Sequence, residues 1–233
     1  MLFRSVSPIR TMKPEHRFHS YVTAATVAVM YYVVQHVAPL MSGGTVPFAQ
    51  PVAALLLSVG VYKLLASFLL STSRRFKFVK RHLLGANYVN GTWYGKFRLD
   101  DGSLVHTVEH FEQTLSSLKI RGQGFRSSGS SYAQWTSVSE TIDAEAGILT
   151  YTYNCDKTND KASFQGVCVF QFERADETSG PTCIRGYSAD LIDGVRTENI
   201  EIKLSEDLLP FNQALQIARE LQHLDAEGGI RDD

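Results

Sequence analysis

The sequence predicts a transmembrane α-hairpin followed by an eight-stranded antiparallel up-and-down β-barrel and a C-terminal helix. Two long apolar runs fill the first third of the chain, and the period of the pattern then changes to two, with turn residues between the strands. Residues 1–81 hold ten Lys or Arg and one acid, whereas residues 82–233 hold 13 Lys or Arg and 23 acids. We therefore expect a basic N-terminus (1–19), a two-helix hairpin (20–72), a basic juxtamembrane linker (73–84), a barrel (85–204) and a helical tail (205–233).

The two apolar runs cover residues 20–41 and 51–72, 22 residues each, and the second is interrupted only by Lys63. A helix of about 20 apolar residues crosses the roughly 30 Å hydrocarbon core of a bilayer. Basic residues flank both outer ends, and the segment SGGTVPFAQ between the runs has no charge. The positive-inside rule then places both termini in the cytoplasm. A cleaved signal peptide is a poorer alternative, because the first run is too long and a second span follows it.

Lys63 is the one charge inside the predicted hairpin. It precedes Arg74 by 11 residues, which is about 16 Å of helical rise, so it is expected near the bilayer centre. A charge at that depth normally faces a bundle interior or water. Lys63 is either a tolerated lysine that snorkels or a polar group that promotes helix association or lines a water path. The hydroxyls of Tyr31 and Tyr32 are its candidate partners.

The alternating pattern of the soluble part predicts eight strands joined by hairpins, at about 91–99, 103–114, 117–126, 132–143, 147–155, 165–174, 182–191 and 194–204. Turn signals such as DDGS and DAEAG separate several of them. Eight short strands of this kind suit a closed barrel, and closure removes exposed strand edges. In the tail, apolar residues recur at spacings of three and four and predict an amphipathic helix. We expect that helix to dock on its own barrel, with a neighbouring subunit as the alternative.

Two motifs inside the barrel region invite interpretation. His106 to His110 matches H-x-x-E-H, a zinc-peptidase signature that requires a helix. The alternating surroundings predict a strand instead, on which the histidines would stand about 13 Å apart, too far for one zinc ion. Trp93 lies between Gly91 and Gly95, and we interpret its ring as packing at a closed end of the barrel.

Charge and cysteine content narrow the function classes. The acidic soluble part argues against DNA or RNA as a partner, because nonspecific nucleic-acid binding needs a basic surface. Three cysteines without a C-x-x-C spacing favour reduced thiols over a disulfide framework or a zinc site. No nucleophile–base pair stands out, so we expect a protein that is not an enzyme. Polar residues on both faces of several strands favour a polar ligand inside the barrel.

The order of these parts resembles a known family, the two-transmembrane β-barrel effectors of bacterial CBASS cyclic-oligonucleotide anti-phage signalling systems. The resemblance rests on the hairpin, the basic segment, a barrel opened by NGTWYG, GYSAD late in the barrel and a closing helix. It covers nearly the whole chain. It implies a bacterial inner-membrane protein with no cofactor, whose barrel binds a cyclic dinucleotide made by a partner nucleotidyltransferase. Binding would drive homo-oligomerisation in the lipid bilayer, membrane disruption and abortive infection.

A cyclic dinucleotide offers phosphates that favour Arg or Lys, and bases that favour aromatic faces and amide or carboxylate edges. Six residues of the predicted barrel wall supply these groups: Arg121, Tyr151, Tyr153, Tyr187, Asp190 and Asn199. The alternative function is a membrane-anchored lipocalin-like carrier or sensor of an apolar ligand. That alternative predicts an interior dominated by aliphatic side chains, so the inward or outward direction of each strand residue separates the two hypotheses.

Overall fold

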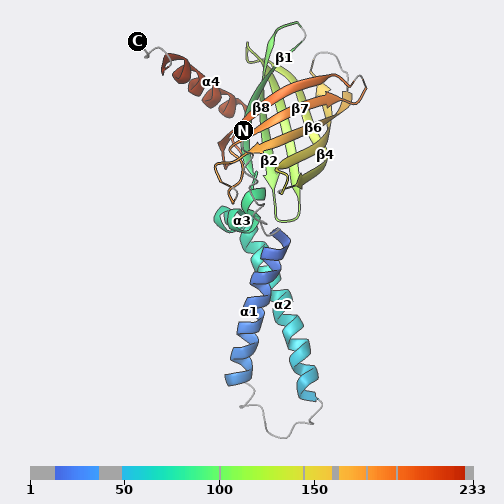
Figure 1. Ribbon diagram of the computed structural model, residues 1–233, viewed down its shortest axis with the longest axis vertical. Coiled ribbons are helices and arrows are strands. Elements are labelled where there is room, and N and C mark those ends of the chain that lie inside the picture. Colours follow the sequence, from blue (N-terminus) through green and yellow to red (C-terminus); the bar gives the residue numbers. More distant parts are fainter. Residues whose placement is uncertain are drawn as a thin grey trace, which may run out of the picture. The chain divides into compact units, whose positions relative to one another are not determined.

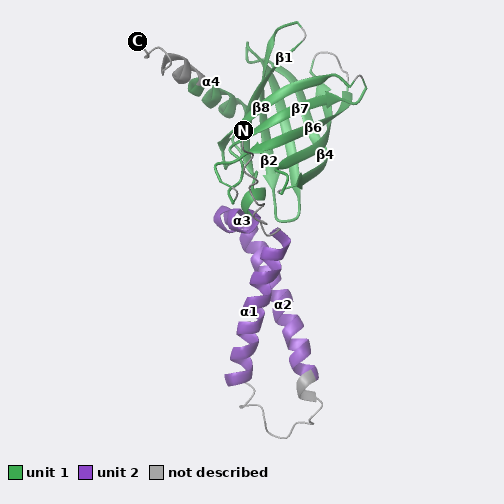
Figure 2. Cartoon of the chain, viewed as in Figure 1, with its two compact units in different colours: residues 1–11, 85–233 green, residues 12–84 purple. Residues whose placement is uncertain are grey.

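The computed structural model describes residues 14–36, 49–99, 101–143, 145–158, 163–176, 178–192 and 194–228, with the backbone alone at 49–51 and 222–228. The chain divides into two compact units, one within residues 12–84 and the other within residues 85–233 (Figure 2). The uncharged segment between the two apolar runs, SGGTVPFAQ, lies outside the described residues except for its last two residues, 49 and 50.

The second unit is a closed antiparallel barrel in which each strand pairs with the next and the last pairs with the first (Figure 1). This confirms the predicted fold class, and the boundaries of the strands fall close to the expected ones. The eight strands are β1 (Gly91–Arg98), β2 (Leu104–Gln113), β3 (Leu118–Arg126), β4 (Ser131–Asp143), β5 (Ile148–Lys157), β6 (Ser163–Glu173), β7 (Cys183–Asp190) and β8 (Arg196–Ser205).

One end of the barrel is filled by a hydrophobic core around Trp93. The indole is fully buried, and its Nε1 donates a 2.9 Å hydrogen bond to the Val89 carbonyl. Gly91 has a φ of 136°, and a Cβ there would lie 2.0 Å from the Ser205 carbonyl oxygen, so only glycine lets β1 and the end of β8 approach here. Six more side chains of this core have no exposed surface: Val89, Phe111, Ile120, Leu149, Phe170 and Ile184.

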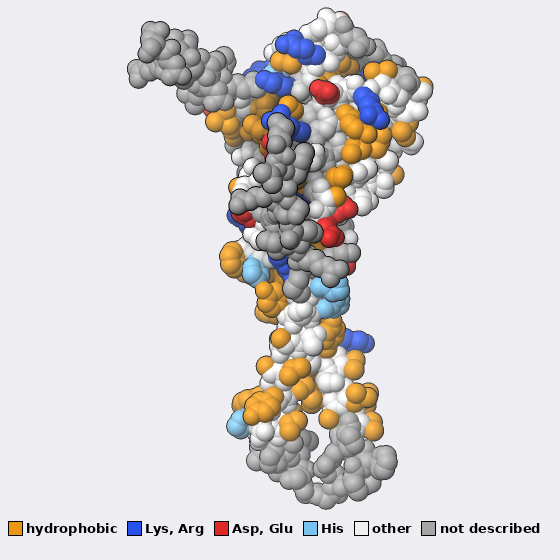
Figure 3. Space-filling model, in the orientation of Figure 1, with side chains coloured by type: hydrophobic (Ala, Val, Ile, Leu, Met, Phe, Trp, Pro, Cys, Tyr) orange, Lys and Arg blue, Asp and Glu red, His pale blue; other side chains and the backbone are white. Residues whose placement is uncertain are grey.

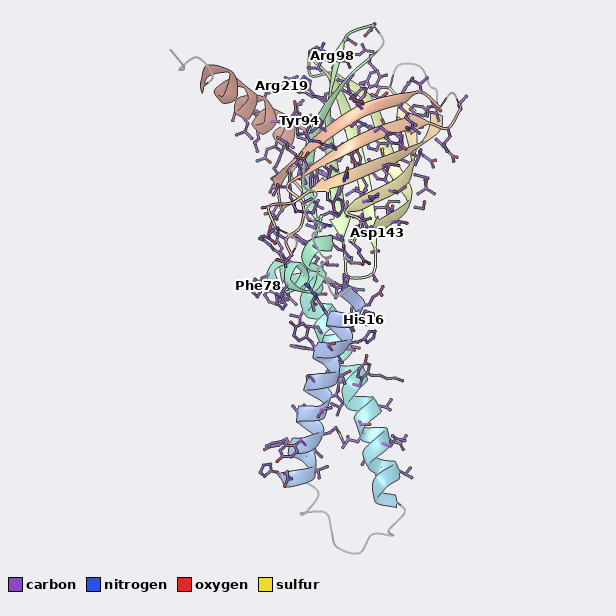
Figure 4. The ribbon with its side chains drawn as sticks, in the orientation of Figure 1. His16, Phe78, Tyr94, Arg98, Asp143 and Arg219 are labelled. Atoms are coloured by element: carbon purple, nitrogen blue, oxygen red, sulfur yellow. The ribbon has the colours of Figure 1, made fainter. Side chains whose placement is uncertain are left out.

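The C-terminal helix α4 (Phe211–Gly228) packs on the outer wall of its own barrel, as expected. Ala214, Leu215 and Ala218 contact outward side chains of β1, β2 and β3, one of which is Tyr94 (Figure 4). His110 donates a 2.6 Å hydrogen bond from Nε2 to the Leu209 carbonyl, and its ring stacks on Phe211. These contacts bury the outer face of β2, which explains why both faces of that strand exclude water.

The H-x-x-E-H motif lies on β2, which confirms the predicted strand. His106 and His110 face outward, and His106 Nδ1 lies 2.7 Å from the Tyr94 hydroxyl. Between them, Glu109 faces inward. Among the residues that the structure describes, no group of three His, Cys, Asp or Glu side chains is arranged to hold a metal ion.

The first unit contains α1 (Pro14–His36), α2 (Ala49–Arg75) and the short helix α3 (Lys77–Leu84), and a single 3-10 turn, η2 (Gly85–Asn87), then leads into the barrel unit. Nδ1 of His19 and the Tyr62 hydroxyl, 2.6 Å apart, join α1 to α2. In Figure 3 hydrophobic side chains are spread along both helices and charged ones are few. By length and composition, one helix among the described residues, Val52–Arg75, could cross a membrane.

Candidate ligand-binding site in the barrel

A cavity of about 230 Å³ lies inside the barrel, away from the Trp93 core. Its lining includes Leu99, Tyr132, Lys157 and Val195, which stand where strands meet the β1–β2, β3–β4, β5–β6 and β7–β8 connections. Arg98 marks this end of the barrel, and Asp143 lies at the other (Figure 4). The cavity therefore opens at the end opposite to the one where the chain enters β1.

Two aromatic rings form much of the cavity wall, and each occupies the space above a glycine on a neighbouring strand. A Cβ at Gly122 would lie 2.0 Å from the Trp135 ring, and one at Gly166 would lie 2.3 Å from the Tyr153 ring. Glycine at these inward positions lets the rings lie flat against the strands. The result is a pair of flat aromatic surfaces facing the interior, suited to stacking against a planar ligand.

The inner part of the cavity holds the carboxyl group of Glu109, which is 3% exposed. Oε1 accepts a 2.7 Å hydrogen bond from Trp135 Nε1, and the Tyr151 hydroxyl lies 3.1 Å from both carboxyl oxygens. Burial raises the pKa of Glu109 to about 7, although both hydrogen bonds oppose the rise. Glu109 is therefore divided between its neutral and charged forms near neutral pH.

A second buried carboxyl group, Glu201, lines the same cavity from β8. Its side chain is 2% exposed, and Oε2 has no hydrogen-bond partner among the described residues. Burial, and after it the charge of Glu109, hold the pKa of Glu201 well above its usual range. On the same face of β8, Asn199 donates from Nδ2 to Ser188 Oγ at 3.0 Å, while its buried Oδ1 has no partner in the described part of the chain.

Positive charge lies at the cavity mouth. The Lys157 ammonium stands 5.3 Å from the centre of the Phe164 ring, and both residues line the cavity. Arg98 also borders the mouth, but it is exposed and shares the outward face of β1 with Tyr94. The acidic groups thus lie deeper than the basic ones, except for Asp190 at the end of β7.

Four of the residues proposed from the sequence face the barrel interior. Tyr153, Asp190 and Asn199 line the cavity. Tyr151 is fully buried behind it and reaches the site through its hydrogen bonds to Glu109. These four come from β5, β7 and β8, so barrel closure brings them together.

The prediction that Arg121 and Tyr187 face the barrel interior is wrong. Arg121 lies on the outer wall, half-exposed and ion-paired with Glu112, because the inward positions of β3 are Ile120 and the glycine under Trp135. Tyr187 also faces outward, with the Arg196 guanidinium 4.4 Å from its ring centre. Since residues alternate along a strand, the inward position of Asp190 excludes Tyr187 from the same face.

Lys63 belongs to the helical unit and not to this cavity. It is exposed on α2, as Tyr31 and Tyr32 are on α1. Among the described residues no hydrogen bond joins the lysine to either hydroxyl. Its role in a membrane stays a prediction.

The sequence interpretation missed Glu109, Glu201 and Trp135, which form the centre of the site. In β8 the polar residues Thr197, Asn199 and Glu201 face inward, while Ile200 and Ile202 are exposed outside. If the barrel interior is assumed to be hydrophobic, the same alternation predicts that the isoleucines face inward and the polar residues face outward. The available signal was the unusual alternation of acids and amides with isoleucine in TENIEIK.

Comparisons with known proteins find structures with a similar fold but no family for this chain. No family model and no curated protein matches the chain. Among solved structures, the redesigned β-barrel mFAP1 bound to DFHBI matches with a TM-score of 0.35 and 20% identity, covering 51% of this chain and 97% of that one. A de novo designed fluorescence-activating β-barrel matches with a TM-score of 0.32 and 21% identity, covering 51% of this chain and 94% of the design. These similarities are to β-barrels and extend to fold alone.

Proposed function

We propose that this chain is a membrane-anchored receptor whose barrel binds a cyclic dinucleotide, and that it acts as a CBASS effector. The observation that carries the receptor proposal is the cavity with two buried carboxyl groups, one of which has an unpartnered oxygen among the described residues. Buried polar atoms are normally hydrogen-bonded. An interior that leaves such acceptors open is suited to a ligand that brings its own N–H donors.

The chemistry of the wall matches a nucleobase. Trp135 and Tyr153 offer flat faces for stacking, and the carboxyl groups with Asn199 offer hydrogen-bonding edges. Lys157 at the mouth suits the phosphates, which remain outside the acidic interior. An apolar ligand would leave two carboxyl groups buried against hydrocarbon, which is costly. The lipocalin-like alternative is therefore less favoured.

The size of the cavity defines how such a ligand would sit. At about 230 Å³ it falls below the roughly 300–1,000 Å³ typical of sites that enclose a drug-sized molecule. We expect one base to enter the barrel, with the phosphates at the mouth and the second nucleotide outside. A second nucleotide exposed in this way is available to another copy of the barrel, which supports ligand-driven oligomerisation.

The helical unit supplies the proposed effector part. Its α2 segment is apolar enough to span a bilayer, and we propose two spans in the bacterial inner membrane with both termini in the cytoplasm. Clustering of barrels by the ligand would raise the local concentration of helices and stabilise their weak mutual contacts. The resulting assembly would disrupt the membrane and kill the infected cell.

The test is the thermal stability of the full-length chain in detergent with cyclic dinucleotides and, separately, with fatty acids. At a ligand concentration 100 times Kd, binding should stabilise the protein by about 2.7 kcal/mol. Lys157→Ala should weaken binding, and the matched outer-wall change Arg121→Ala should not. Stabilisation by fatty acids without any response to cyclic dinucleotides would favour the apolar carrier.

A further inference from the structure

Two acceptor atoms on the inward face of β8 are left without partners. Oδ1 of Asn199 and Oε2 of Glu201 are both buried and unbonded among the described residues, and their side chains stand two residues apart on the same strand. Residues at this spacing point to the same face, about 7 Å apart. Both side chains line the cavity. A single planar group entering the cavity can therefore contact both side chains.

The surroundings of Glu201 favour its neutral form. Trp135 Nε1 and the Tyr151 hydroxyl both bond to Glu109 and not to Glu201. Lys203, the next inward residue of β8, has its ammonium 4.5 Å from the centre of the Tyr88 ring and 5.6 Å from the centre of the Trp93 ring. A buried carboxylate without a cation or donors beside a second carboxyl group is strongly unfavourable. The raised pKa of Glu201 agrees with this geometry.

A neutral carboxyl group and a carboxylate bind different hydrogen-bonding edges of a planar ligand. The carboxylate only accepts hydrogen bonds, whereas the neutral acid presents one O–H donor beside one carbonyl acceptor. Asn199 adds a further acceptor, because its Nδ2 is already bonded to Ser188 Oγ. The complete set is one donor followed by two acceptors.

We propose that Glu201, as a neutral acid, and Asn199 together select a base whose amino group stands beside a ring-nitrogen acceptor, the edge that adenine and cytosine share. One amino N–H donates to the Glu201 carbonyl oxygen, and the Glu201 hydroxyl donates to the ring nitrogen. The second amino N–H donates to Asn199 Oδ1. This assignment rests on the proposed function, because it assumes that the ligand is a nucleotide.

Other bases fit this set less well. Uracil carries a carbonyl oxygen where cytosine has its amino group, so it would leave Asn199 Oδ1 facing another acceptor. Guanine presents two adjacent donors, N1–H and its amino group, which match an ionised carboxylate. A site that excludes a base by leaving its polar groups unpaired discriminates more strongly than one that relies on shape.

The experiment measures Kd of the full-length chain in detergent for cyclic di-AMP, cyclic di-CMP, cyclic di-UMP and cyclic di-GMP. The first two should bind about tenfold or more tightly than the others, since one lost hydrogen bond is worth about this factor. Glu201→Gln keeps a carbonyl acceptor beside an N–H donor and should retain binding of cyclic di-AMP within about threefold. Glu201→Ala should weaken it by about tenfold.

The outcomes separate this inference from the function on which it rests. If none of the four dinucleotides binds, both are overturned. If cyclic di-GMP binds best and Glu201→Gln abolishes its binding, the receptor function stands and the neutral acid is wrong. Should Glu201→Gln fail to fold, Asn199→Ala decides: the preference for cyclic di-AMP over cyclic di-UMP should fall by about tenfold. An unchanged preference would overturn the role of Asn199.

Discussion

The indole Nε1 of Trp135 donates a 2.7 Å hydrogen bond to Oε1 of Glu109 inside the barrel. The bond crosses from β4 to β2 over Gly122 of β3, which has no side chain to obstruct the ring. It supplies one of the donors that make a buried carboxyl group tolerable. The ring that forms the cavity wall therefore also positions the acid at the inner part of the cavity.

Trp135→Phe removes this donor while keeping an aromatic ring. At pH 8, where Glu109 is mostly ionised, we expect a loss of about 1–3 kcal/mol in the free energy of unfolding, because a hydrogen bond to a charged group is lost. Urea denaturation followed by the fluorescence of Trp93, the other of the two tryptophans, measures it. In a Glu109→Gln background the same change should cost less, and an equal cost would show that packing alone is responsible.

Glu109 should make the stability of the barrel depend on pH. Its pKa is raised from 4.5 to about 7 in the folded protein, so the folded state binds this proton more tightly than the unfolded state does. Stability contributed by the neutral acid is present below about pH 4.5 and is lost as the pH rises to about 7, by about 3 kcal/mol in total. Glu201 acts with the same sign, since its pKa is also raised.

The matched variant for this pH dependence is Glu109→Gln. His106 and His110 have lowered pKa values because of burial, so they add stability with rising pH and oppose the acids. Their contribution is common to both proteins and cancels in the difference between parent and variant. That difference should change by about 3 kcal/mol between pH 5 and pH 8. A difference that is flat over this range would contradict the raised pKa.

The two inward glycines of β3 provide a test of the aromatic wall. A Cβ at Gly122 would lie 2.0 Å from Trp135, whereas the nearest atoms to a Cβ at Gly124 lie 3.4 Å away, which is ordinary contact. Gly122→Ala should displace the ring and cost about 1–3 kcal/mol, with loss of ligand binding. Gly124→Ala, on the same strand and face, should change stability by less than about 1 kcal/mol. If Gly122→Ala and Gly124→Ala had equal effects on stability and on ligand binding, the Trp135 ring would be free to move.

Lys63 tests the proposed membrane part. Lys63→Leu should leave expression, membrane insertion and ligand binding unchanged but block ligand-dependent leakage, because a clustered ring of ammonium groups would draw water into the bilayer. Dye entry into cells after the ligand is supplied measures the leakage. Lys63→Arg keeps the charge and should leak as the parent does. Rapid leakage by Lys63→Leu would assign the damage to the number of clustered helices.

The sequence by itself determined the parts of this protein that depend on local pattern. Period-two alternation and turn residues located all eight strands, because a strand needs only its own residues to show two faces. The spacing of Leu215 and Ala218 likewise predicted the α4 face that packs on the barrel. The apolar run of α2 was evident from composition alone.

Only the tertiary structure decided which face of each strand points inward. In β3 the polar face with Arg121 lies outside, and in β8 the polar face with Glu201 lies inside. The alternation in the two strands is similar, so the direction follows from register: Glu201 pairs with Gly95, and Gly122 pairs with Trp135. Closure of the barrel fixes these pairings through contacts distant in sequence. That is why a cavity with two buried acids was not visible in the sequence.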